Sequence, residues 1–334
     1  MTPPAISVIV PVYNTPLPTL ETCIGCLRDQ TFGDFEAIVI DDGSERNIAD
    51  GIDALCAEDG RFCVVHTSNR GVSAARNLGV KRARGAVVCF ADADDYFALW
   101  MLEDLWHAYR SDEDIDCVCS YMITTERDDF PFQRTDRSVQ TASKAFMEKA
   151  ALVGNIYSKG ESSFLSLGPS AILISAEVAK KNPFKDDIRY MEDTIWNLQR
   201  IKLSRGTAVL DEAVYAYKMN PYSATHTFDR DVVDSRIRAL GYLSDQVSDD
   251  MREWFALRVL ANFFACCKCV MCSPGNDGPI KRLQDAGRMS MHPIWDAFRD
   301  RGITKNWRRR EKIKRRLALS GLLPLAILIK GVKR

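Results

Sequence analysis

Three carboxylates fall within four residues at Asp92-Ala93-Asp94-Asp95, directly after the apolar run Ala86 to Phe90. Carboxylates at this spacing repel one another unless water or a divalent cation neutralises them. Their oxygens are hard ligands of the kind that Mg²⁺ or Mn²⁺ takes together with a diphosphate. The same residues could instead form a solvated acidic turn that caps the following helix. The motif therefore indicates a site for a metal and a diphosphate without excluding a structural turn.

Two further polar clusters contain residue types that suit a nucleotide. The segment Pro11-Val12-Tyr13-Asn14 offers an aromatic face for stacking on a nucleobase and an amide for hydrogen bonding. The segment Asp41-Asp42-Gly43-Ser44 offers a carboxylate that can accept a hydrogen bond from a ring N–H, and Gly43 permits a tight turn. Taken singly, each cluster could be an ordinary surface turn.

The elements that must position these clusters alternate between two hydrophobic patterns. Apolar runs predict strands over residues 6–10, 37–40, 62–65 and 86–90, and apolar residues at helical spacing follow each run. Strands that are apolar throughout and separated by helices are typical of a mainly parallel sheet covered on both faces. Ligands of such sheets bind beyond the carboxyl ends of the strands. Because each polar cluster follows a predicted strand, we expect the three clusters to converge on one crevice.

The pattern loosens after a further predicted strand over residues 116–121. A charged loop over 124–138 precedes a predicted helix over 143–152, and the Gly- and Ser-rich segment 154–170 is expected to be a loop. Strands over 172–174 and 213–218 and a helix over 191–203 complete the pattern. Only helical periodicity remains from Phe228 onward, so we expect an α/β domain followed by a helical region.

Four blocks occur in order between residue 5 and about residue 110: VIVPVYN, QTFGDFEAIVIDDGS, NRGVSAARNLGVKRARG and VVCFADADDYF. They resemble the N-terminal half of inverting family 2 glycosyltransferases of the GT-A fold, the type that builds bacterial surface polysaccharides. A sparser resemblance extends to about residue 226 through Tyr190-Met191-Glu192-Asp193-Thr194 and Ser223-Ala224-Thr225. It implies a GT-A catalytic domain over 1–225, a helical region over 226–304 and a basic amphipathic tail over 305–334.

The resemblance also implies roles for individual residues in binding the donor. The nucleobase is expected to contact Pro11, Tyr13 and Asn14, and its uracil ring is expected to be recognised by Asp42. The diphosphate is expected to contact Arg76 and Asn77, and the ribose is expected to contact Asp92. Asp94 matches the ligand of Mn²⁺ or Mg²⁺. His226 falls where some members place a further ligand of metal or diphosphate, although a lone His can equally have a surface or packing role.

The implied general base is Asp193, with Glu192 beside it. Displacing a nucleoside diphosphate from an anomeric carbon builds negative charge on the leaving oxygens, which a metal on Asp94 can offset. A carboxylate on the opposite face can take the proton of the acceptor hydroxyl during in-line attack, so the configuration inverts. No covalent intermediate between sugar and enzyme is required.

These roles predict a metal-dependent hexosyltransferase that uses a nucleoside-diphosphate sugar, a UDP-sugar in the first place. The expected acceptor is a hydroxyl of a saccharide or a polyprenyl-linked saccharide in polysaccharide biosynthesis. The sequence has no GxGxxG after the first strand and no GxxxxGK[ST], which argues against dinucleotide-dependent dehydrogenases and P-loop NTPases. The alternative is a catalytically silent member that binds a saccharide or scaffolds an assembly at the membrane. The retained carboxylates Asp92, Asp94 and Asp193 argue against it.

The charges of the chain are unevenly distributed. Its 45 basic and 45 acidic residues balance, but the segment from Lys305 to Arg334 holds eleven basic residues and one acid, Glu311. The apolar run from Leu317 to Ile329 is too short to cross a bilayer, which needs about 20 residues. We therefore predict a peripheral anchor on an anionic membrane surface. The alternative is a helix that packs on the catalytic domain, while the lack of interleaved aromatic residues argues against nucleic acid.

The eleven cysteines are irregularly spaced, and no signal-peptide pattern opens the sequence. These features favour the reducing cytoplasm, with the protein peripheral on the inner face of the cell membrane. Cys266, Cys267, Cys269 and Cys272 lie in an apolar run without turn residues, which favours buried thiols over a metal or redox site. With 46% hydrophobic and 27% charged residues in 334, the composition excludes a disordered or collagen-like chain.

Overall fold

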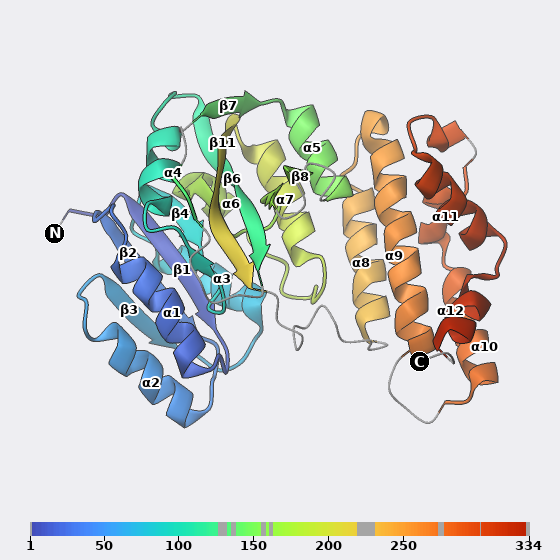
Figure 1. The fold of residues 1–334 in the computed structure, drawn as a ribbon, viewed down its shortest axis with the longest axis horizontal. Coiled ribbons are helices and arrows are strands. Elements are labelled where there is room, and N and C mark those ends of the chain that lie inside the picture. The colour runs from blue at the N-terminus through green and yellow to red at the C-terminus, as the bar shows by residue number, and fades with distance from the viewer. Residues whose placement is uncertain are drawn as a thin grey trace. The chain divides into compact units, whose positions relative to one another are not determined.

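The structure, a computed structural model, describes residues 2–125, 132–134, 138–154, 158–159, 163–218, 231–272, 277–300 and 302–331. The chain divides into two compact units (Figure 1). The first unit comprises residues 1–187 and 196–220, and the second comprises residues 188–195 and 221–334. The first unit contains the sheet, and the second is built from helices.

The sheet of the first unit has the order β3-β2-β1-β4-β10-β6-β11-β5, with β7, β8 and β9 attached at its side. Its strands are β1 (Ile6–Val12), β2 (Phe35–Asp41), β3 (Phe62–His66), β4 (Val87–Phe90), β5 (Tyr96–Phe97), β6 (Ile115–Thr125), β7 (Val139–Ala142), β8 (Ser158–Lys159), β9 (Ser163–Leu165), β10 (Ile172–Ser175) and β11 (Gly206–Lys218). The pairs β1–β2, β2–β3, β1–β4 and β6–β11 are parallel. Strand β10 runs antiparallel to both β4 and β6, so the sheet is mixed with a parallel N-terminal half.

The helices of the first unit cover both faces of the sheet. They are α1 (Leu17–Arg28), α2 (Arg46–Cys56), α3 (Val72–Arg82), α4 (Met101–Tyr109), α5 (Lys144–Val153), α6 (Ala176–Lys181) and the later part of α7 (Glu192–Leu203). Along β1, Val8 and Val10 belong to the core that includes Leu20 of α1, whereas Ile9 belongs to the core that includes Val80 of α3. Alternate side chains of one strand therefore enter two different cores, which explains why the strand is apolar at nearly every position.

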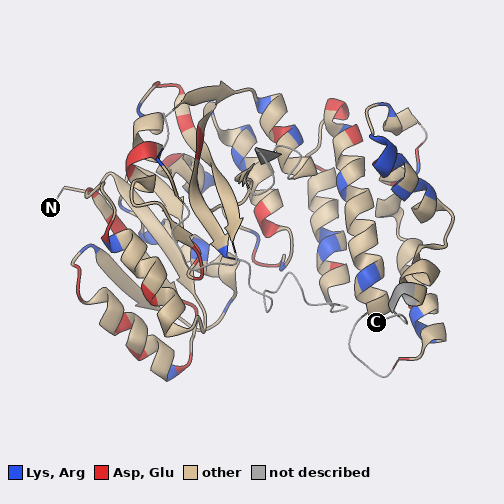
Figure 2. Ribbon diagram, viewed as in Figure 1, with Lys and Arg blue, Asp and Glu red and all other residues tan. Residues whose placement is uncertain are grey.

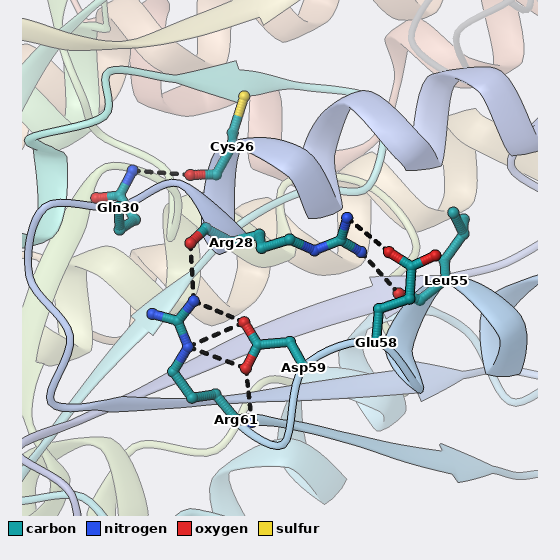
Figure 3. Close-up of polar contacts among 7 residues, drawn as sticks. All are labelled: Cys26, Arg28, Gln30, Leu55, Glu58, Asp59 and Arg61. Carbon is teal, nitrogen blue, oxygen red and sulfur yellow. Dashed lines mark hydrogen bonds and ion pairs between the residues drawn. The ribbon is translucent and has the colours of Figure 1, made fainter.

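The C-terminal ends of α1 and α2 are tied together by two arginines (Figure 3). Arg28 donates to the carbonyl of Leu55 at 2.9 Å and pairs with Glu58 at 2.9 Å. Arg61, held by Asp59, donates to the carbonyl of Arg28 at 2.7 Å. Cations at these positions satisfy carbonyls that a helix leaves without partners in its last turn. The two helices are thereby held together at the start of β3.

The second unit is organised around one long helix, α9 (Arg252–Cys272). The other helical elements are α8 (Asp231–Ser244), η3 (Asp249–Met251), α10 (Pro279–Ser290), η4 (Pro293–Phe298), η5 (Gly302–Thr304), α11 (Arg309–Leu319) and α12 (Leu323–Gly331). Helices α8, α10, α11 and α12 all pack against α9. The segment Asp249–Cys272 is long and apolar enough to cross a membrane, but 61% of its most apolar window is buried inside the protein. Such burial is typical of a core helix.

The cysteine-rich segment lies within α9. Cys266, Cys267 and Cys269 are buried, and burial raises the pKa of Cys266 and of Cys267 to about 12. Thiols with so high a pKa stay protonated near neutral pH and pack as small apolar groups. The prediction of buried thiols is thus confirmed for these three residues, but it is wrong for Cys272, which is exposed at the C-terminal end of α9.

Candidate active site

The first two polar clusters meet where β1 and β2 end. The amide of Asp42 donates to the carbonyl of Val12 at 2.8 Å, and the amide of Asn14 donates to the Ser44 hydroxyl at 2.9 Å. The Asn14 side chain in turn accepts from the amide of Glu45 at 2.8 Å. Pro11 is buried within β1, whereas Tyr13 is 55% exposed. The ring of Tyr13 is therefore open to a flat ligand at this edge of the sheet.

The carboxylate of Asp42 holds the segment that leads into α3. It accepts from the amide of Arg70 at 2.9 Å and from the amide of Gly71 at 2.7 Å, and the residue is almost fully buried. Gly43 has φ +81°, and a Cβ at this residue would lie 2.6 Å from the amide nitrogen of Asn69. Glycine is thus required for the tight turn. Each Asp42 oxygen retains a second lone pair, so its predicted contact to a nucleobase stays chemically open.

The carboxylate of Asp92, just beyond β4, is held by an ion pair and a hydrogen bond from two other segments. Arg76 of α3 pairs with Oδ1 at 2.8 Å, and the hydroxyl of Ser170 donates to Oδ2 at 2.8 Å. The amide of Asp92 donates to the hydroxyl of Tyr215 on β11 at 3.0 Å. Asp92 is therefore fixed at the meeting point of α3, β4 and β11.

Asp94 and Asp95 lie close enough to Asp92 to feel its negative charge. The Asp94 side chain reaches solvent, yet desolvation by the surrounding protein and then the charge of Asp92 raise its pKa. Burial, followed by the charges of Asp92 and Asp94, raises the pKa of Asp95 well above its usual range. Asp95 accepts from the amide of Lys218 at 2.9 Å. The turn thus holds an excess of negative charge, which a cation would relieve.

The carboxylates of this turn can be compared with the ligands that a metal ion requires. Among the residues that the structure describes, no group of three or more His, Cys, Asp or Glu forms a complete metal cage. Mg²⁺ and similar hard cations bind through one or two carboxylates together with substrate phosphates and water. The exposed oxygens of Asp94 beside Asp92 fit a cation that arrives with a diphosphate, and they do not fit a closed structural site.

Asn77 contacts a different segment from its neighbour Arg76. Its amide nitrogen donates to the carbonyl of Phe184 and to Asp186, both at 2.9 Å, and its oxygen accepts from the amide of Phe184 at 2.8 Å. The Phe184 ring stacks on Trp196 and lies 5.3 Å from the guanidinium carbon of Arg76. Asn77 therefore positions the packing against Arg76, and its place beside a diphosphate stays a prediction.

Glu192 and Asp193 begin helix α7 and belong to the second unit. Oδ1 of Asp193 accepts from the amide and the hydroxyl of Thr194. Burial lowers the pKa of Arg258 on α9, and the charge of Asp193 opposes this shift. The candidate base therefore lies in the first turn of a helix with the Arg258 cation nearby. His226 and residues 223–225 lie outside the described residues.

Ser170 and Tyr215 are residues of this site that the sequence did not reveal. Ser170 precedes β10 and Tyr215 lies within β11, and neither belongs to a motif. They are separated from Asp92 by 78 and 123 residues along the chain. Only the tertiary fold brings them to the carboxylate, so no local signal could have found them.

Residues 7–168 match the family model described as glycosyl transferase family 2. Over 237 residues the chain is 30% identical to "Uncharacterized glycosyltransferase EpsJ" of Bacillus subtilis (strain 168), covering 70% of this chain and 67% of that protein. The chain belongs to glycosyltransferase family 2. This family 2 glycosyltransferase is also 29% identical to "Glycosyltransferase GlyG" of Streptococcus pneumoniae serotype 4, over 69% of this chain and 77% of that one. The transferase class predicted from the sequence is thereby confirmed.

Solved structures share the fold of this family 2 glycosyltransferase. TarS residues 1–349 of S. aureus, solved with UDP-GlcNAc, has a TM-score of 0.54 at 17% identity and covers 88% of this chain and 89% of that one. The mannosyltransferase PcManGT of Pyrobaculum calidifontis, solved with GDP-Man and Mn²⁺, has a TM-score of 0.55 at 15% identity, covering 98% and 87%. At these identities the likeness is one of fold, and it confirms the GT-A architecture with a helical C-terminal region.

Proposed function

We propose that this chain is an inverting, metal-dependent glycosyltransferase that transfers one sugar from a nucleoside-diphosphate sugar to an acceptor hydroxyl. The donor proposed first is a UDP-sugar, and the acceptor is a saccharide or a lipid-linked saccharide. Proteins of the same fold were solved with UDP-GlcNAc and with GDP-Man and Mn²⁺, which supports this donor class.

The observation that carries the proposal is the division of charge at Asp92-Ala93-Asp94-Asp95. Arg76 pairs with Asp92 and Ser170 donates a hydrogen bond to it, whereas Asp94 has a raised pKa and an exposed carboxylate. A solvated turn that only capped a helix would gain nothing from a buried arginine on its first carboxylate. Mg²⁺ and similar cations bind through one or two carboxylates together with substrate phosphates, and the exposed carboxylate of Asp94 is open to such a cation.

The residues of the first unit would bind and orient the donor. Tyr13 offers its exposed ring to the base, Asp42 can accept from a ring N–H, and Asp92 can accept from a ribose hydroxyl. A divalent cation on Asp94 would act as a Lewis acid toward the leaving diphosphate oxygens. Fixing these groups before the donor binds reduces the entropy lost in reaching the reactive geometry.

Asp193 is proposed to supply the proton-transfer step. As the acceptor oxygen attacks the anomeric carbon, Asp193 takes the hydroxyl proton, and the bond from that carbon to the diphosphate oxygen breaks with its electron pair on the diphosphate. Attack opposite to the leaving group inverts the configuration. Asp193 lies in the first turn of α7 with the Arg258 cation nearby, and its carboxylate would accept the proton as a general base.

Release of nucleoside diphosphate from a panel of UDP-sugars with Mn²⁺ and candidate saccharide acceptors tests the proposal. NMR of the product reports whether the anomeric configuration is inverted. Asp193→Asn should lower kcat about 10²- to 10⁴-fold, the range for one general base, while the Kd of the donor stays unchanged. The matched control is Asp187→Asn, an exposed aspartate a few residues away. A retained configuration, or full activity of Asp193→Asn, would contradict the mechanism.

A further inference from the structure

Helix α11 presents a basic stripe to solvent. Lys and Arg are frequent along this helix (Figure 2). Arg309, Lys312 and Arg316 are all exposed, and their spacing of three and four residues places them on one face of the helix. Exposed apolar side chains occur on the same helix at Ile313 and Leu319, which are 54% and 46% exposed.

The next helix, α12, presents an apolar stripe. Leu322, directly before the helix, and Leu325 and Ile329 within it follow the same spacing, and each is roughly half exposed. Leu323 is buried on another side of the helix, which packs against α9 and α10. The packing of α12 within the second unit therefore accounts for Leu323, whereas about half of the surface of Leu322, Leu325 and Ile329 faces solvent.

Both stripes are held in place by the rest of the second unit. Arg315 donates to the carbonyl of Phe298 at 2.6 Å and to that of Arg299 at 2.5 Å. Ala318 is buried, and the Lys314 amine lies 5.9 Å from the ring of Phe264 on α9. Helix α11 thus turns Lys314, Arg315 and Ala318 inward, and this packing fixes the basic stripe outward.

We propose that the basic stripe of α11 and the apolar stripe of α12 form a docking surface for an anionic phospholipid membrane. Phosphate headgroups complement the basic side chains, and the acyl region accepts Leu322, Leu325 and Ile329. Helix α12 has nine residues and is about 14 Å long at 1.5 Å per residue, so it is too short to cross a bilayer. The surface lies on one leaflet as part of a folded unit.

Sedimentation of the full chain with vesicles tests the proposal. Wild type should bind vesicles of phosphatidylcholine with one third phosphatidylglycerol, and binding to pure phosphatidylcholine should be about tenfold weaker or more. Arg309→Glu/Lys312→Glu and, separately, Leu322→Ser/Leu325→Ser should each weaken binding to the anionic vesicles by a similar factor. The matched control, Arg46→Glu/Lys180→Glu, makes the same change in net charge at exposed positions of α2 and α6 and should bind like wild type.

Unchanged thermal melting would show that each variant is folded. Equal vesicle binding of the control and the α11 variant, or no preference of wild type for anionic vesicles, would overturn the proposal. A wild-type dimer in analytical ultracentrifugation that dissociates in Leu322→Ser/Leu325→Ser would also overturn it, because the occupant of the apolar stripe would then be a second copy of the chain. The result is independent of the glycosyltransferase chemistry, since no residue of the donor site is changed.

Discussion

Three neighbouring aspartates are given different environments by their surroundings. Asp92 is paired with a buried arginine, Asp94 is exposed, and Asp95 is buried against the end of β11. Residue type and spacing predict Asp92 and Asp94 as site residues, because hard cations take carboxylate ligands, and their roles stay predictions. The contacts of Asp92 with Arg76, Ser170 and Tyr215 could not be predicted from spacing, because the fold brings these residues to the turn.

Tyr215 is expected to act as a positioning residue for this turn. Its buried hydroxyl accepts from the amide of Asp92, and its hydrogen bonding opposes the rise in the pKa of Asp95. Tyr215→Phe should lower the free energy of unfolding by about 1–3 kcal/mol, because the Asp92 amide loses its partner. The KM of the donor should rise while kcat changes less. Tyr217→Phe on the same strand is the control for urea unfolding and kinetics, and equal effects of the two variants would refute the role of Tyr215.

At the scale of elements, the parallel half of the sheet follows the sequence closely. The strands predicted over 6–10, 37–40, 62–65 and 86–90 correspond to β1 to β4, and the predicted convergence of polar clusters at their ends is confirmed for β1 and β2.

The direction of β10 could not be predicted, since an apolar run has the same pattern in a strand with parallel neighbours and in one with antiparallel neighbours. The segment 154–170 was expected to be a loop and contains β8 and β9, whose two and three residues are too short for a periodic signal. The six-residue helix α6 was missed for the same reason.

Helix α3 must approach β1 closely for Arg76 to reach Asp92. A Cβ at Gly79 would collide with the side chain of Ile9 on β1, whereas a Cβ at Gly25 in α1 would meet nothing within 4 Å. Gly79→Ala should therefore lower the free energy of unfolding by about 1–3 kcal/mol. Gly25→Ala should raise it by up to about 1 kcal/mol through helix propensity alone. Urea unfolding of both variants checks the prediction, and equal shifts of the same sign would contradict it.

His66 joins three elements near the nucleotide edge. Its ring nitrogens lie 2.8 Å from Asp41 of β2 and 3.1 Å from Asp53 of α2, and the hydrogen bond to Asp41 is the main cause that raises its pKa. Because the pKa of His66 is higher in the folded than in the unfolded protein, protonated His66 stabilises the folded state. This stabilisation is complete below the pKa of histidine in the unfolded chain, about 6.5, and it is lost as pH rises through the pKa of His66 in the folded protein.

The free energy of unfolding of wild type should thus fall between pH 6 and pH 9 by more than that of His66→Gln. His107→Gln on α4, an exposed histidine, should retain the wild-type slope. Urea unfolding across this pH range measures the difference. If wild type and His66→Gln gave the same dependence on pH, His66 would not be a stabilising link.

At the scale of the whole molecule, the chain contains eleven free cysteines and two folded units. Nine thiols are buried, and Cys63 and Cys272 are exposed. Reaction with DTNB should therefore modify about two thiols rapidly in the native protein and all eleven in guanidinium chloride, because burial prevents access to the reagent. Reductant should leave the melting temperature unchanged. Rapid reaction of many more thiols in the native state would contradict the packing of α9 and of the sheet.

Binding of nucleotides by the whole protein tests the central claim most directly. Thermal melting is measured with UDP, GDP, CDP or dTDP, each with Mn²⁺, Mg²⁺ or EDTA, on wild type, Asp94→Asn and the exposed control Asp50→Asn. A ligand at 100 times its Kd raises the free energy of unfolding by about 2.7 kcal/mol, so binding at this site should appear as a higher melting temperature. We predict stabilisation by UDP that requires metal, persists in Asp50→Asn and disappears in Asp94→Asn. No shift with any nucleotide would contradict the account and favour a catalytically silent saccharide-binding protein.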